Sequence, residues 1–373
     1  MGIAPLAWAS YSDTYATRRK VYLASILLYI IASILCGISR NIWLLLVMRA
    51  LQACGGSSVQ SLGVATISDT FHSFERGTAY GLFYVGPLVG PIMGPIFGGY
   101  LTDYLETFRH QKSPPPSTPC IIKEIIEEKE NIGNGNGNGN DEKLKESLNI
   151  SSPTSQRFNP IAPLKLLRYP NVALTVIFVS VAFSLIYVVG TLLPNIFQQR
   201  YNLSTSQVGL VFLPPGIGYM LGSIFGGRYS DYVLAKSTKN LSEKSNNNME
   251  SGISNEYPEL RLKSALLGGI LMPIAYVMYG WFINYNINLI APLSMLFIGG
   301  ASLMIIFSST STYLVDSFPK KSASVIAANN FGRSITTALM SILAKPFEDL
   351  IGTGWLYTSM ALLSVITGFG LVL

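Results

Sequence analysis

The sequence predicts an all-α membrane protein, because the chain is unusually apolar and its apolar residues gather in long runs. Hydrophobic residues make up 49% of the 373 residues, and Asp, Glu, Lys and Arg only 12%. That is about half the share of charged residues in a soluble domain. The stretch from Thr78 to Thr102 carries no charged residue, and about 20 apolar residues are enough to cross the hydrocarbon core of a bilayer. These observations argue against a soluble fold.

Apolar runs with the length of a membrane span recur along the chain. Residues 1–12 form the first run, which is too short to cross alone and predicts only part of a helix. A window of about 19 residues predicts nine complete spans further on. They cover residues 21–38, 41–67, 78–102, 172–198, 206–226, 264–283, 287–309, 322–344 and 354–373.

Two polar segments divide these spans. Residues 105–168 hold a triple proline, a charged run at 123–130 and a Gly-Asn repeat. Such a composition buries too little apolar surface to offset the ordering entropy, so it predicts a disordered linker. The charged run leaves a short helix or a docking segment open as an alternative. We therefore expect a partial N-terminal helix bundle at 1–104, the linker at 105–168, and a C-terminal six-helix bundle at 169–373 with a polar loop at 229–262.

The formal charge of +6 is interpreted as a sign of topology, because Lys and Arg gather in cytoplasmic loops. Most basic residues near span ends lie at 13–20, 68–77, 229–262 and 316–321, and we expect these four loops in the cytoplasm. Three crossings from the first of these loops place the linker outside, whereas the second half of the chain requires it inside. One crossing is therefore missing between residues 103 and 170.

Glycines recur within the uncharged stretch so that one helix face lacks side chains, and another helix can pack closely against such a face. Prolines at four-residue spacing are tolerated there, because neighbouring groups satisfy the freed carbonyls. The pattern resembles the antiporter motif of the major facilitator superfamily. Its fixed positions correspond to Gly81, Gly90, Gly94, Pro95, Gly98 and Gly99.

A short repeat links the two halves of the chain, as in transporters built from related halves. The segments 9–13 and 227–231 both end in Tyr-Ser-Asp after an apolar run. They resemble the superfamily's cytoplasmic-loop motif, which implies a gating role. Its positions fall on Asp13 and Asp231 for the acid, Gly227 for the leading glycine, and Arg18 and Arg19 for the basic pair, one residue late. Ala9, Thr14 and Ala16 depart from the motif.

Arg49, Gln52, Gly56 and Gln60 share one face of the predicted helix at 41–67. An intramembrane arginine is costly and normally faces a protein interior or a wet cavity. Snorkelling of Arg49 to the membrane interface is the alternative. The residues from Arg49 to Gln52 resemble the superfamily's fourth-helix arginine motif, which favours a role in the cavity or in coupling.

A polar set also occurs in the second half. Asp316, together with residues 319–324 and 327–333, resembles a stretch common in fungal proton-driven drug exporters of the superfamily. Asn330, Arg333 and Thr337 share a helical face. They are candidates to line a cavity from this side, and a structural polar contact between helices is the alternative.

The resemblance implies the superfamily's twelve-span, two-bundle fold, incomplete here without its first helix, most of its second and its sixth. It also implies proton-coupled export of small organic or drug-like compounds that are cationic or amphipathic. A truncated, transport-incompetent membrane protein derived from such a transporter remains the alternative.

Other classes of protein find little support in the sequence. No ATP-binding Gly-x-x-x-x-Gly-Lys-Ser/Thr pattern occurs, and the two histidines, His72 and His110, lie in polar segments. We expect no enzymatic activity, cofactor or metal site. The expected partners are a small-molecule substrate, protons and the lipid bilayer, without nucleic acid. We expect a monomer, in the plasma membrane rather than the vacuolar membrane.

Overall fold

The computed structural model describes residues 2–15, 18–39, 41–111, 162–245 and 258–372. Contacts between residues join Met1–Asp103 and Phe158–Leu373 into one compact unit, and Tyr104–Arg157 form a second unit. The predicted linker therefore lies almost wholly outside the described residues, and its charged run at 123–130 falls there too. The expected disorder of the linker stays a prediction for the residues outside the described ranges.

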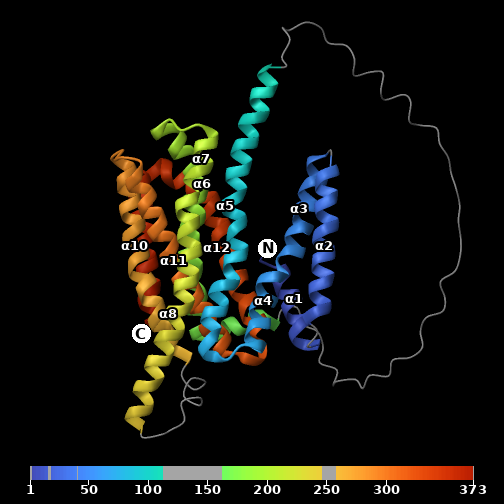
Figure 1. Cartoon of the computed structure of the whole chain (residues 1–373), viewed down its shortest axis with the longest axis vertical. Helices are drawn as coiled ribbons and strands as arrows, with labels where there is room; N and C mark the ends of the chain where they lie inside the picture. The colour runs from blue at the N-terminus through green and yellow to red at the C-terminus, as the bar shows by residue number, and fades with distance from the viewer. Residues whose placement is uncertain (1, 16–17, 40, 112–161, 246–257, 373) are drawn as a thin grey trace, which may run out of the picture. The chain divides into compact units, whose positions relative to one another are not determined.

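The N-terminal half of the first unit consists of helices only (Figure 1). The predicted span at 41–67 is divided into two helices at Ser57. Asn41 begins the first of them by accepting a hydrogen bond from Trp43 N in its side chain. The helices are α1 (Ala4–Tyr15), α2 (Arg18–Ile38), α3 (Ile42–Gly56), α4 (Ser58–Thr70) and α5 (Ser73–Gln111).

The C-terminal half is helical as well, and its helix ends have local causes. Asn202 stops α6 in the left-handed conformation with φ 51°, a role that asparagine tolerates. A capping box of Ser204 and Gln207 then starts α7. The elements are η1 (Ala162–Arg168), α6 (Pro170–Tyr201), α7 (Thr205–Val211), α8 (Leu213–Ser245), η2 (Pro258–Arg261), α10 (Leu262–Asn284), α11 (Ile290–Ser317), η3 (Pro319–Lys321), α12 (Ser322–Ile351) and α13 (Thr353–Val372).

Helical structure extends into both of the predicted polar segments. Helix α8 continues through the first part of the expected loop at 229–262 and ends at Ser245. The seven residues of η1 form a 3₁₀ helix within the expected linker, and α5 extends to Gln111. Charged residues continue a helix without difficulty once it leaves the bilayer, so hydropathy marks the membrane boundary and not the helix end.

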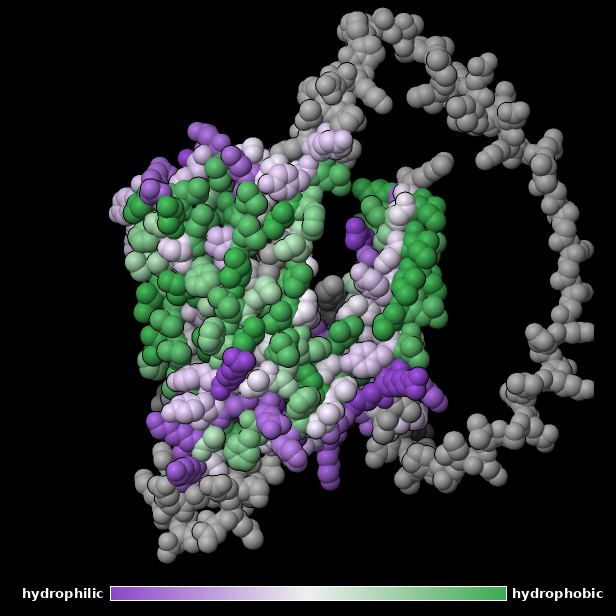
Figure 2. All heavy atoms as spheres, in the orientation of Figure 1, coloured by the Kyte–Doolittle hydropathy of each residue, from purple (hydrophilic) through white to green (hydrophobic). Residues whose placement is uncertain are grey.

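Seven segments of the described chain are long and apolar enough to cross a membrane. They are Arg18–Ile38, Ile42–Thr70, Ser73–Leu101, Pro170–Tyr201, Thr205–Lys239, Glu259–Asn284 and Ile290–Ser317. The remaining two predicted spans, 322–344 and 354–373, form α12 and α13. On the face that Figure 2 shows, apolar residues form a belt across the helices and hydrophilic residues gather toward the ends, as the bilayer requires.

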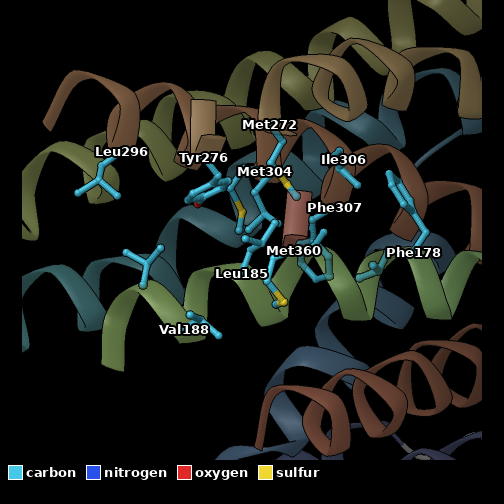
Figure 3. Packing of buried hydrophobic residues seen from close by; sticks show 14 of the residues in the cluster. Phe178, Leu185, Val188, Met272, Tyr276, Leu296, Met304, Ile306, Phe307 and Met360 are labelled. Atoms are coloured by element: carbon cyan, nitrogen blue, oxygen red, sulfur yellow. The ribbon is translucent and has the colours of Figure 1, made fainter. Parts of the chain in front are cut away.

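The main core lies in the C-terminal half, where α6, α10, α11 and α13 pack together (Figure 3). Leu185, Met272, Tyr276 and Tyr357 are at most 1% exposed. A smaller cluster joins the two halves through small side chains, and it comprises Leu6, Ala9 and Ala65 from α1 and α4 with Ala323 and Ala327 from α12. This second cluster lets the halves approach closely near one end of the bundle.

Candidate functional site

A cavity of about 470 Å³ lies between the two halves. Helices α4 and α5 contribute Gln60, Pro87 and Leu88 to its wall. The C-terminal half contributes the rest, namely Phe183, Ile186, Tyr187, Val189, Gly190, Thr191, Leu193, Phe212, Pro215, Gly216, Tyr219, Met304 and Arg333. The wall is mostly apolar with a few convergent polar groups, the usual character of a small-molecule site.

Arg333 is the one formally charged side chain among these lining residues. Its Nη2 donates a hydrogen bond to Gln60 Oε1 at 3.1 Å, from α12 of one half to α4 of the other. The guanidinium lies over the rings of Phe183 and Phe307, at 4.4 and 5.3 Å from the ring centroids. Such cation–π contacts hold the cation in place without neutralising it.

At one end of the bundle, a set of polar contacts ties the halves together. We call this set the clasp, and it consists of Asp13, Arg76, Asp231, Arg261 and Asp316 with their partners. Asp231 on α8 accepts hydrogen bonds from the backbone N–H groups of Gly77 and Thr78 at 2.9 and 2.7 Å, and from Thr78 Oγ1 at 2.7 Å. These donors lie in the second turn of α5, which begins at Ser73.

The close approach of α5 and α8 explains the glycine of the loop motif. A Cβ on Gly227 would overlap the backbone carbonyl oxygen of Gly77, and a Cβ on Gly81 would overlap that of Ser223. Ser223 Oγ also donates to Gly81 O at 2.6 Å. Only residues without a side chain fit at this crossing, so Gly81 and Gly227 set the distance between the two halves.

Asp13 makes the equivalent contact from the N-terminal half to the C-terminal half. Its Oδ2 accepts from the backbone N–H of Ser324 at 2.9 Å and from Ser324 Oγ at 2.5 Å, at the start of α12. Arg18 approaches Asp13 at 3.8 Å and pairs with Asp69 at 2.6 Å. Burial raises the pKa of the Asp13 carboxyl above its ordinary value of 3.8, and the bonds from Ser324 and the charge of Arg18 offset only part of that effect.

A buried network of two arginines and two aspartates completes the clasp. Asp316 accepts from Arg76 Nη1 and from Arg261 Nε, both at 2.6 Å, and Arg261 Nη1 reaches Asp231 at 3.1 Å. The Arg261 side chain is fully buried, and that of Asp316 is 6% exposed. Arg261 also donates to the backbone carbonyl of Ser73 across the halves. Each charge has an opposite partner, which a buried ion requires.

The clasp brings the four basic loops of the sequence to one end of the bundle, as their shared topology predicts. Helix α5 runs from this end to the opposite one, where Gly99 lies beside Thr205 at the start of α7. Helix α6 begins again at the clasp end, since the ring of Tyr169 contacts that of Phe318 next to Asp316. Helix α5 therefore finishes at the end opposite the clasp, whereas α6 begins at the clasp end. One further membrane crossing would be needed between them, in agreement with the missing crossing that the charge pattern predicts.

The other predicted residues lie apart from the cavity wall. Arg49 is exposed on α3 and donates to Gln52 Oε1 at 3.0 Å, and Gln52 Nε2 donates to Ser33 Oγ at 2.9 Å. Asn330 is 4% exposed and its amide nitrogen has no hydrogen-bond partner, but it does not line the cavity. Arg19 is exposed. The roles of these residues in transport stay predictions.

The glycines of the antiporter motif are not in close contact along the whole helix. A Cβ on Gly99 would lie 3.1 Å from Thr205 O, but a Cβ on Gly90, Gly94 or Gly98 would meet no atom within 4 Å. The expectation of a closely packed glycine face is therefore wrong for the middle of α5. Helix α7 instead approaches α5 at Pro95, where a Cβ on Gly209 would lie 2.8 Å from Pro95 O.

Sequence reasoning missed several contributors to the site. Arg76 and Arg261 each flank an apolar run, and the sequence gives no sign that both pair with Asp316. The aromatic wall of Phe183, Tyr187 and Tyr219 also went unpredicted. Apolar and aromatic residues look alike in a membrane span whether they face lipid or a cavity, so only the packing distinguishes them.

Together, the apolar belt, the cavity between two halves and the polar clasp at one end define an integral, multi-pass membrane transport protein. The sequence model of the Major Facilitator Superfamily matches residues 1–109 and 126–341. The chain belongs to the Major Facilitator Superfamily.

Three proteins similar to this chain are fungal transporters. The chain is 31% identical to the MFS-type transporter penM of Penicillium rubens, with 94% of this chain and 69% of penM aligned. It is 25% identical to the MFS antiporter QDR3 of Candida albicans, over 97% of this chain and 68% of that protein. It is 29% identical to the efflux pump radE of Floropilus chiversii, over 98% and 69%.

A solved structure shares the fold. The crystal structure of the human organic anion transporter MFSD10 (TETRAN) superposes with a TM-score of 0.62 and 15% sequence identity, over 99% of this chain and 80% of that one.

Proposed function

We propose that the chain exports small amphipathic organic compounds in exchange for protons, across the plasma membrane. The observation that carries the proposal is the cavity of about 470 Å³ between two halves that are joined at one end by the clasp. Polar contacts to helix starts can form and break as a unit, whereas a continuous apolar core would hold the halves together permanently.

The closed clasp indicates which conformation of the transport cycle the structure represents. With these contacts formed, the end that carries the basic loops is closed. The positive-inside rule assigns that end to the cytoplasm. The structure then corresponds to the state in which the cavity communicates with the outside, and export requires the clasp to open so that cargo enters from the cytoplasm. The names of radE as an efflux pump and QDR3 as an antiporter support this direction.

Proton coupling is assigned to the clasp. The cavity wall has no Asp or Glu among its lining residues, whereas the clasp has three aspartates. Burial raises the pKa of Asp13 in the closed clasp, and opening would return this carboxyl to water. The Asp13 carboxyl therefore binds a proton more readily in this conformation than in the open one, and this difference has the sign that an antiporter driven by an inward proton gradient needs.

Of the two cargo classes that the sequence leaves open, the cavity supports the amphipathic one. The wall combines aromatic rings and aliphatic side chains with the hydroxyl groups of Tyr187, Thr191 and Tyr219. It provides apolar surface for a drug-sized body and a few hydrogen bonds for orientation.

The test is efflux of fluorescent amphipathic compounds from yeast lacking its own exporters, with and without a proton uncoupler. Gly190 lines the cavity and a Cβ there meets no atom within 4 Å, so Gly190→Trp should fill the cavity and abolish efflux. Gly37 on α2 also has open space around its Cβ and lies outside the cavity wall, so Gly37→Trp is the matched control. Equal efflux by both variants would contradict the proposal. Membrane-inserted protein without uncoupler-sensitive efflux would favour a membrane protein that does not transport.

A further inference from the structure

The cavity has a charge that nothing in its wall neutralises. Arg333 is the one ionised side chain among the lining residues, and it forms no ion pair with a carboxylate of the described chain. In the clasp, Asp316 and Asp231 already pair with Arg76 and Arg261. The guanidinium cannot shed its proton, so the cavity is permanently positive.

The surroundings of Arg333 leave part of its hydrogen-bonding capacity unused. A guanidinium has five N–H donors in one plane. Gln60 Oε1 accepts from Nη2. The rings of Phe183 and Phe307 are the other close neighbours of the guanidinium, and they offer a π face but no oxygen acceptor. The in-plane donors that remain suit two oxygens of one oxyanion, the bidentate geometry that distinguishes arginine from lysine.

The same environment disfavours a cation. An apolar wall lowers the effective dielectric constant, which strengthens both the attraction of an anion and the repulsion of a cation. Phe212, Leu88 and Ile186 offer apolar surface to the body of a ligand. The cavity therefore discriminates by charge at Arg333 and accepts varied apolar bodies elsewhere.

We propose that the cavity binds amphipathic organic monoanions, such as carboxylates or sulfonates with an aromatic or aliphatic body, and that Arg333 pairs with the oxyanion. This inference rests on the proposed function for the role of the cavity. It replaces the cationic cargo that the sequence leaves open.

The experiment measures binding to the purified full chain in lipid nanodiscs, by equilibrium dialysis of three radiolabelled probes with one aromatic body. The probes are 1-naphthylacetate, the neutral 1-naphthylacetamide and the cationic 1-naphthylmethylammonium. We expect the wild-type chain to bind the anion at least about tenfold more tightly than the amide, and the cation most weakly. Equal affinities for the three probes, or the tightest binding for the cation, would overturn the proposal.

Two variants separate charge recognition from a structural role of the contact between halves. Arg333→Gln removes the charge, and we expect it to abolish the preference for the anion while the amide binds as before. Gln60→Ala breaks the same interhelical hydrogen bond but keeps the charge, and we expect it to retain the preference. If both variants lose the preference equally, Arg333 acts through the contact and the proposal fails.

A third variant keeps the test valid if Arg333→Gln unfolds. Arg333→Lys keeps a positive charge without the bidentate fork, and we expect a reduced preference for the anion that remains above that for the amide. Wild-type chain that binds the anion selectively without uncoupler-sensitive efflux would contradict the proposed export and leave the ligand class in place.

Discussion

Asp231→Asn tests whether the clasp controls the opening of the bundle. Asp231 accepts three hydrogen bonds from Gly77 and Thr78 across the halves. When the clasp opens, this carboxylate is exposed to water, so the substitution weakens the closed state and affects the open state little. Asparagine has nearly the same size, and the change removes the charge rather than the side chain.

The magnitude follows from the number of bonds. Asparagine presents one accepting oxygen in place of two, because its other terminal atom is an NH₂ donor. At least one of the three bonds is therefore lost, at a cost of about 1.5–3 kcal/mol for a bond to a charged group, and the bonds that remain become neutral ones that are weaker by about 1 kcal/mol each. The closed state is then destabilised by at least about 3 kcal/mol relative to the open one. A difference of that size multiplies the open population about a hundredfold.

The assay is the labelling rate of a single cysteine placed between the halves. Ala327 is 0% exposed in the cluster that joins α1, α4 and α12, so Ala327→Cys reacts with a hydrophilic maleimide only in the open state. The native residues Cys36, Cys54 and Cys120 are first replaced by serine. Asp231→Asn should then raise the labelling rate at least about a hundredfold, up to saturation of the open state.

Asp69→Asn is the matched control, because it removes the same charge. Asp69 pairs with Arg18 at 2.6 Å, but its side chain is 48% exposed. Exposed ion pairs contribute about 0–1 kcal/mol, so the control should raise the rate by about fivefold at most. If the two variants label at the same rate, the contacts of Asp231 do not hold the closed state and the reasoning is refuted.

Further predictions follow from the same geometry. Because the closed clasp raises the pKa of Asp13 and the open state restores a value near 3.8, protonation favours closure, and labelling normalised to unfolded protein should slow as the pH falls from about 7 to about 4. Asp13→Asn should remove this dependence, and faster labelling in acid would contradict it. Gly81→Ala should lower the thermal unfolding temperature, since its Cβ would overlap a backbone carbonyl and overpacking costs about 1–3 kcal/mol. Gly94→Ala, on the same helix with open space around the Cβ, should leave that temperature unchanged or raise it, and equal losses in both would refute the packing argument. Arg49→Ala should abolish efflux while the protein stays in the membrane, and normal efflux would place Arg49 among snorkelling residues.

The sequence predicts most helices correctly because a bilayer leaves the backbone few alternatives. A long apolar run must satisfy its own hydrogen bonds, and an α-helix does so. The break at Ser57 was not predicted, because a window of about 19 residues averages the small residues from Gly55 to Ser58 with the apolar residues around them. The end of α8 at Ser245 was also missed, because the helix continues beyond the apolar residues that hydropathy detects.

The clasp could be predicted only in part. The repeated Tyr-Ser-Asp places Asp13 and Asp231 at equivalent points of the two halves, and each accepts hydrogen bonds from backbone N–H groups in the first two turns of a helix of the opposite half. Their partners could not be predicted, since a backbone N–H has no sequence signature. Arg261 could not be assigned either, because the basic residues around it look alike and only one of them is fully buried.

Arg49 and Arg333 show that the sequence predicts which residues share a helix face but not which helix that face contacts. Each is an arginine in a predicted span with amide side chains at helical spacing, Gln52 near Arg49 and Asn330 near Arg333. Helical periodicity establishes that each pair shares a face, but a shared face does not say which helix lies opposite. The structure places Gln60, Phe183 and Phe307 around Arg333, whereas the hydrogen bond of Arg49 stays within α3. The partners of Arg333 come from three other helices and confine its charge to the cavity. The chemistry of this site therefore depends on residues from four helices, as far apart in the sequence as Gln60 and Arg333, and their convergence is a property of the packing rather than of any one segment.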